Sequence, residues 1–169
     1  MTSTFRLRSD AARCVGKKDY QQAIEHWREV IERDPQDLFS QAMVAHCFEW
    51  MGEFSQALDA ATIVLDRKPT DPVCLQIAAR AAVALEQHDQ AVVYVEQSLM
   101  HPMNYSLMGN RLLNVLSVIL RIGSFIPLLK RIHHNLGRQR AQFGRLDADW
   151  DDWARKYLAW YRSIVDGKK

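Results

Sequence analysis

The feature that most constrains this chain is a sequence repeat with a period of 34 residues. Ala23, Ala57 and Ala91 are separated by that interval, and each directly follows a glutamine. Pro35 and Pro69 keep the same spacing. A fixed period between roughly 20 and 50 residues indicates one supersecondary unit that is copied and stacked, because a single unit cannot bury its apolar face alone. The sequence therefore predicts an array of equivalent units.

Within each unit, apolar residues fall at helical spacing. Leu7, Ala11 and Cys14 are four and three residues apart, which places them on one face of a helix. The second half of the unit stops at Pro35, since proline cannot continue a helix. The pattern thus predicts helix-turn-helix units over three ranges, 4–37, 38–71 and 72–105.

The recurring alanines predict close packing between these helices. Two helices approach closely only where the side chain between them is short, and a larger residue would overpack the interface. We therefore expect Ala23, Ala57 and Ala91 to be buried. Larger apolar residues at matching places complete the expected core: Leu7, Trp27, Val30, Val44, Phe48, Val64, Leu65, Leu75, Val95 and Leu99.

This pattern of paired helices, with its alanines and prolines, resembles the tetratricopeptide repeat (TPR) family. The resemblance implies an all-α fold, an α-solenoid of TPR helix-turn-helix repeats. It also implies that the first helices of successive repeats line a concave groove. Proteins of this kind bind other proteins, so the resemblance favours a non-catalytic adaptor over an enzyme.

Beyond the third repeat the pattern weakens. The turn at Gly123–Phe125 is similar to the one at Gly52–Phe54, which predicts a fourth, degenerate hairpin over 109–143. A last helix is expected over 147–166. The whole chain, 1–169, has the length of one domain and is short for two, so we expect a single domain.

The last helix has a wide apolar arc rich in aromatic residues: Trp150, Trp153, Tyr157, Trp160 and Tyr161. Two interpretations stay open. The helix can cap the end of the solenoid, or part of the arc can be a second interface, for a partner or for a homodimer.

Carrying the family's groove positions over to this sequence gives a set of candidate binding residues. It combines aromatic anchors with hydrogen-bonding side chains, a composition typical of binding hot spots. The set comprises Phe5, Arg8, Phe39, His46, Glu49, Trp50, Gln76 and Arg80. The predicted occupant of the groove is a peptide or helix of a partner protein.

Two more specific family modes can be compared with the residues. Members that clamp the C-terminal carboxylate of chaperones need Lys, Arg and Asn at positions occupied here by Arg8, Ala12, Met43, Val73 and Ile77. Only Arg8 is suitable, which argues against that clamp. The chain also resembles the small three-repeat type III secretion chaperones. Those proteins usually carry a helical extension before the first repeat, whereas the first repeat of this chain begins at about Thr4. A small secretion or assembly chaperone therefore remains an alternative.

Charge is unevenly distributed along the chain. Residues 1–108 have ten basic and fifteen acidic residues, whereas residues 109–145 have seven basic and none acidic. The basic hairpin segment 130–145 is an alternative site for nucleic acid or an anionic surface. Its cations can equally pair with the acidic repeats, and the lack of interleaved aromatic residues argues against nucleic acid.

The sequence offers little for catalysis, cofactors or metals. His46 and Glu49 lie one helical turn apart, as metal ligands can, but no third ligand lies nearby, so we expect a hydrogen-bonded pair. The cysteines form no CxxC motif and are expected to be structural.

No N-terminal signal segment is evident, and polar residues interrupt the most apolar stretch, 112–129. We expect no membrane span and a cytoplasmic location.

Overall fold

The computed structural model describes residues 3–102 and 148–166, and all regular structure in these ranges is helical. The six labelled helices are α1 (Thr4–Gly16), α2 (Tyr20–Arg33), α3 (Leu38–Met51), α4 (Phe54–Arg67), α5 (Pro72–Ala84) and α6 (His88–Met100). A further helix spans 148–166, close to the predicted 147–166. The chain divides into two compact units, Met1–His101 and Pro102–Lys169.

Local signals place the helix ends. Asp19, Asp37 and Asp71 are N-caps, and each carboxylate accepts a hydrogen bond from the backbone N–H three residues further on. Pro72 occupies the first turn of α5, where its missing N–H costs nothing. Gly52 ends α3 with a φ of +79°, a left-handed conformation that glycine adopts without steric cost.

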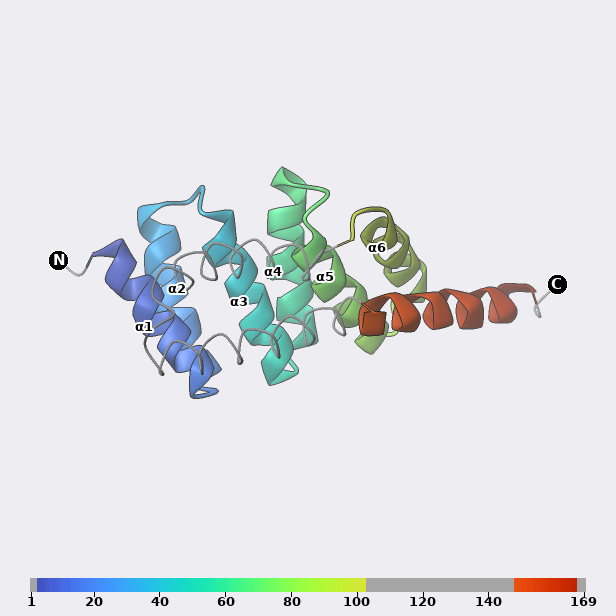
Figure 1. Ribbon diagram of the computed structural model, residues 1–169, viewed down its shortest axis with the longest axis horizontal. Helices are drawn as coiled ribbons and strands as arrows, with labels where there is room; N and C mark the ends of the chain where they lie inside the picture. Colours follow the sequence, from blue (N-terminus) through green and yellow to red (C-terminus); the bar gives the residue numbers. More distant parts are fainter. Residues whose placement is uncertain (1–2, 103–147, 167–169) are drawn as a thin grey trace, which may run out of the picture. The chain divides into compact units, whose positions relative to one another are not determined.

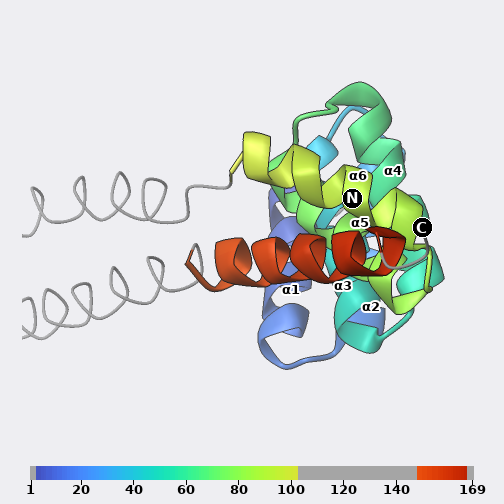
Figure 2. The ribbon, with the colours of Figure 1, turned by 90° about the vertical axis from the view of Figure 1, so that its right-hand side faces the viewer.

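The first unit is a row of helical hairpins. Within it, α1 packs on α2, α3 on α4 and α5 on α6, and α2 and α4 each pack on the first helix of the next hairpin. The helices follow one another in chain order along the row (Figure 1), and the view of Figure 2 looks along it. The first helices α3 and α5 also contact each other. This arrangement is the predicted α-solenoid.

The three periodic alanines lie in the core. Ala23, Ala57 and Ala91 have no exposed surface, as predicted. The other expected core residues are buried as well, except Leu99, which is half-buried.

The thiols behave as apolar core groups. Cys47 and Cys74 are buried, and Cys14 is half-buried. Burial raises the pKa of the Cys47 thiol to about 11 and also raises the pKa of Cys74. Both therefore stay protonated and unreactive near neutral pH, which supports the expected structural role.

The aromatic residues of helix 148–166 form a continuous ladder. Ring centroids are 4.9 Å apart for Trp150 and Trp153, 5.6 Å for Trp153 and Tyr157, and 5.6 Å for Tyr157 and Trp160. Trp150 and Tyr157 are buried, whereas Trp160 is 45% exposed. The cap of the solenoid and the second interface, for a partner or for a homodimer, both stay predictions.

Several sequence predictions fall outside the described residues. These are the degenerate hairpin 109–143 and the basic hairpin segment 130–145. The single-domain assignment and the cytoplasmic location also remain predictions. None of the helices that the structure describes is long and apolar enough to cross a membrane.

Candidate functional site

The surface formed by the first helices α1, α3 and α5, here called the first-helix face, carries three exposed aromatic side chains. Phe5 is 82% exposed, Phe39 61% and Trp50 44%. Such residues lose solvent contact only when something binds over them, so their exposure on one type of helix marks a candidate interaction surface.

The exposed rings of Phe39 and Trp50 pack against other aromatic side chains of this unit. Phe39 meets the buried Trp27 of α2 edge-on, with ring centroids 5.7 Å apart and an interplanar angle of 83°. Trp50 stacks on His46 at 4.8 Å and also contacts Tyr20 of α2 at 5.3 Å. Aromatic pairs of this geometry stabilise the rings beyond their buried area. A partner would therefore bind anchors that are already oriented.

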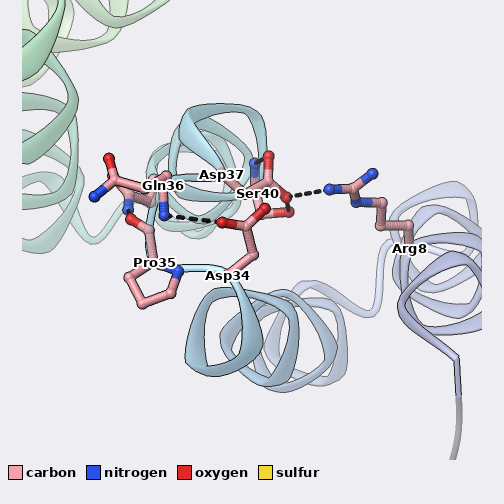
Figure 3. A network of polar contacts seen from close by, with 7 residues as sticks. Arg8, Asp34, Pro35, Gln36, Asp37 and Ser40 are labelled. Carbon is pink, nitrogen blue, oxygen red and sulfur yellow. Dashed lines mark hydrogen bonds and ion pairs between the residues drawn. The ribbon is translucent and has the colours of Figure 1, made fainter.

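Arg8 lies at the junction of the first two repeats, and it is already paired (Figure 3). Its Nη2 donates to Asp37 Oδ2 at 2.7 Å. The same carboxylate caps α3, because Oδ1 accepts from the backbone N–H of Ser40 at 3.3 Å and Oδ2 accepts from the Ser40 hydroxyl. The Asp37 carboxylate thus links α1 to the start of α3.

These bonds set the ionisation of Asp37. Burial of its carboxyl would raise the pKa, but the hydrogen bonds from Ser40 and Arg8 and the positive charge of Arg8 outweigh it, so the pKa is lowered. A carboxylate with a depressed folded-state pKa stabilises the fold above its unfolded-state pKa. That stabilisation is lost as pH falls through the folded-state pKa.

We expect Asp37→Asn to lower the free energy of unfolding at pH 7 by about 1 kcal/mol, since the amide still caps α3 but loses the charge that pairs with exposed Arg8. In acid, below the lowered pKa, the difference from wild type should disappear. Thermal melts followed by circular dichroism over the acidic range measure both effects. Asp66→Asn, at an exposed residue of α4, is the matched control. A difference that persists unchanged in acid would contradict the assignment.

A second ion pair joins the second and third repeats. Arg80 of α5 contacts Glu49 of α3 with two nitrogens, Nε to Oε1 and Nη2 to Oε2, the latter at 3.1 Å. His46 Nδ1 lies 3.2 Å from Glu49 Oε2. The Glu49 side chain is only 10% exposed. Burial alone would raise its pKa, but His46 and Arg80 lower it below the usual value.

The predicted pair His46 and Glu49 is thus close in space. The Glu49 carboxylate also forms the ion pair with Arg80. No group of three or more His, Cys, Asp or Glu side chains gathers as a metal site in residues 3–102 or 148–166. The arrangement of Glu49 is that of a structural ion pair, bidentate to arginine.

The sequence predicts Gln76 on the groove surface, but in the structure Gln76 is buried and only 5% exposed. Its helix, α5, packs against α3, α4 and α6, which leaves little of its circumference open. The structure brings Glu49 and Arg80 together across the repeats and His46 and Trp50 together on α3, whereas Phe39 and Trp50 lie on one side of α3 without touching. Sequence reasoning missed the role of Asp37. The available signal was an aspartate that recurs after 34 residues, since Asp37 and Asp71 are both helix N-caps.

A comparison with protein-family models gives no match, and neither does one with curated proteins. Solved structures do match. The first TPR of Spaghetti (RPAP3), bound to the HSP90 peptide SRMEEVD, is 12% identical with a TM-score of 0.56, over 82% of this chain and 93% of that one. The TPR2B domain of yeast Sti1, in a pHsp70 complex, is 15% identical with a TM-score of 0.55, over 81% and 98%.

A third similar structure is a thermophilic TPR protein from Thermus thermophilus. It is 13% identical with a TM-score of 0.54, over 93% of this chain and 100% of that one. Identities this low establish the fold alone. The first unit therefore has the TPR fold, which confirms the resemblance found in the sequence.

Proposed function

We propose that this chain is a non-catalytic protein-interaction module that holds a segment of a partner protein on its first-helix face. The observation that carries the proposal is the set of exposed aromatic residues Phe5, Phe39 and Trp50 on the first helices α1 and α3. Aromatic anchors on a rigid scaffold are typical centres of binding energy.

The structural comparisons support this use of the fold. The RPAP3 and Sti1 domains are described as bound to an HSP90 peptide and in a pHsp70 complex, so the same helical scaffold holds polypeptide ligands in those proteins. An interaction surface on the first-helix face extends that use to this chain.

The charges on the face favour a partner that is chiefly apolar. Arg8 and Arg80 would be the natural ligands for an acidic segment such as SRMEEVD, but each already pairs with a carboxylate of this chain, Asp37 or Glu49. An acidic tail would have to compete with those carboxylates. An apolar or aromatic segment instead gains contact with Phe5, Phe39 and Trp50 without breaking an ion pair.

The partner can be identified by site-specific photo-crosslinking in the native cell. A photoreactive amino acid at Phe5 or Phe39 should crosslink the same protein, because both positions lie on the proposed face. The same residue at Glu29, which is exposed on the second helix α2, is the matched control and should not crosslink that protein.

The crosslinked segment then allows a quantitative test. We expect Phe5→Ala/Phe39→Ala to weaken its binding by about 2 kcal/mol or more, roughly thirtyfold, in titration calorimetry. The melting temperature should change little, since both side chains are mostly exposed. Unchanged affinity in this variant would place the binding site elsewhere.

A further inference from the structure

A cleft of about 360 Å³ lies between α2, α3 and α4. Arg28 and Ile31 of α2 form one wall, and Asp59 and Ile63 of α4 form the other, with Val44 and Phe48 of α3 between them. Both α2 and α4 pack on α3, which therefore forms the floor.

The cleft lies on the far side of α3 from the first-helix face. Val44 and Phe48 are four residues apart, on one side of the helix, whereas Phe39, His46 and Trp50 repeat at intervals that place them on the opposite side. A ligand in the cleft would therefore not compete directly for the aromatic anchors.

All three helices contribute apolar side chains to the cleft, beside the polar side chains of Arg28, Gln41, Gln56 and Asp59. Val44 and Phe48 are buried, but Ile63 is 52% exposed on the α4 wall. A cavity at the small end of the range for binding sites, roughly 300–1,000 Å³, suits one or two side chains better than a whole helix. An inserted apolar side chain would cover Ile63 and contact Phe48.

Opposite charges flank this apolar space. The guanidinium carbon of Arg28 lies 5.9 Å from the centre of the Phe48 ring, over the floor of the cleft. Asp59 stands on the other wall. Neither takes part in an ion pair within the part of the chain that the structure describes. Among the residues that the structure describes, the two walls thus present a cation and an anion that form no ion pair, and these charges can orient an occupant of complementary charge.

We propose that this cleft is a second docking site, which takes a polypeptide segment of a partner protein. The segment inserts one apolar side chain between α2 and α4. It carries an acidic residue toward Arg28 and a basic residue toward Asp59, so the charges fix its direction across the cleft.

Short synthetic peptides on an array test this directly with the full chain. Each peptide has one central leucine or phenylalanine, flanked by a glutamate and a lysine in either order and at varied spacing. The wild-type protein should retain one order over the other. Ala60→Trp fills the cleft from α4, where Ala60 is a half-buried lining residue, and should reduce retention at least roughly tenfold. Val93→Trp, at an exposed apolar position of α6, is the matched control.

A charge exchange provides a second readout that does not depend on filling the cleft. In Arg28→Glu/Asp59→Arg the walls change sign, so the preferred order of glutamate and lysine should invert while crosslinking from Phe39 stays the same. Equal retention of both orders by the wild type, or the same order retained by wild type and exchanged protein, would overturn the proposal. Undiminished retention by folded Ala60→Trp would do so too.

Discussion

Replacing Ala57 by leucine is expected to lower the free energy of unfolding by about 1–3 kcal/mol, and replacement by tryptophan by more. Ala57 has no exposed surface and lies on α4, which packs on both α3 and α5. Additional side-chain atoms there must push the helices apart or adopt a strained rotamer. Urea unfolding followed by circular dichroism should show a lower midpoint with an unchanged slope.

Ala12→Leu is the matched control for this experiment, because Ala12 is an exposed alanine inside α1. Leucine and alanine have similar helix propensities, so that variant should unfold like the wild type. If Ala57→Leu also unfolded like the wild type, the close contact assigned to the 34-residue period would be wrong.

The fold was predictable because its determinants are local or periodic. The spacing of Ala23, Ala57 and Ala91 specifies where helices touch, and the prolines and caps specify where they end. Each determinant acts within one helix or recurs from one repeat to the next, so a single sequence contains it in full.

The candidate site was predictable only in part. The exposed positions Phe5, Phe39 and Trp50 follow from the repeat register, which assigns each residue to a face. Pairing between repeats does not follow from it. Arg8 and Asp37 are 29 residues apart, and Glu49 and Arg80 are 31 apart. Whether such side chains meet depends on the relative placement of successive hairpins, which the register leaves open.

The cleft between α2 and α4 was missed for a related reason. Its lining residues are individually ordinary: Ile31, Val44 and Phe48 fit the apolar pattern of a core. Only the three-dimensional packing leaves space beside them, since α2 and α4 both contact α3. A sequence pattern indicates which residues are apolar, but not whether neighbouring helices fill the volume between them.

The second large effect is expected at Glu49. Glu49→Ala should lower the free energy of unfolding by about 2 kcal/mol, because it removes the carboxylate that the Arg80 guanidinium contacts with two nitrogens. The loss should be smaller than the roughly 3–5 kcal/mol seen when a fully buried pair is broken, since Arg80 is about one-third exposed and water can partly solvate it. Urea unfolding at pH 7 measures the change.

A double-mutant cycle with Arg80→Ala separates the ion pair from the loss of side-chain packing. If the charges stabilise each other, Glu49→Ala/Arg80→Ala should cost less than the sum of the two single variants, because the contact is already broken by the first substitution. The cycle should be repeated in acid, where wild-type Glu49 becomes protonated below its lowered pKa and the coupling should shrink. Strictly additive losses at pH 7 would show that the contact between α3 and α5 depends on packing alone. An acidic partner on the first-helix face would then engage Arg80 without the loss of a stabilising ion pair.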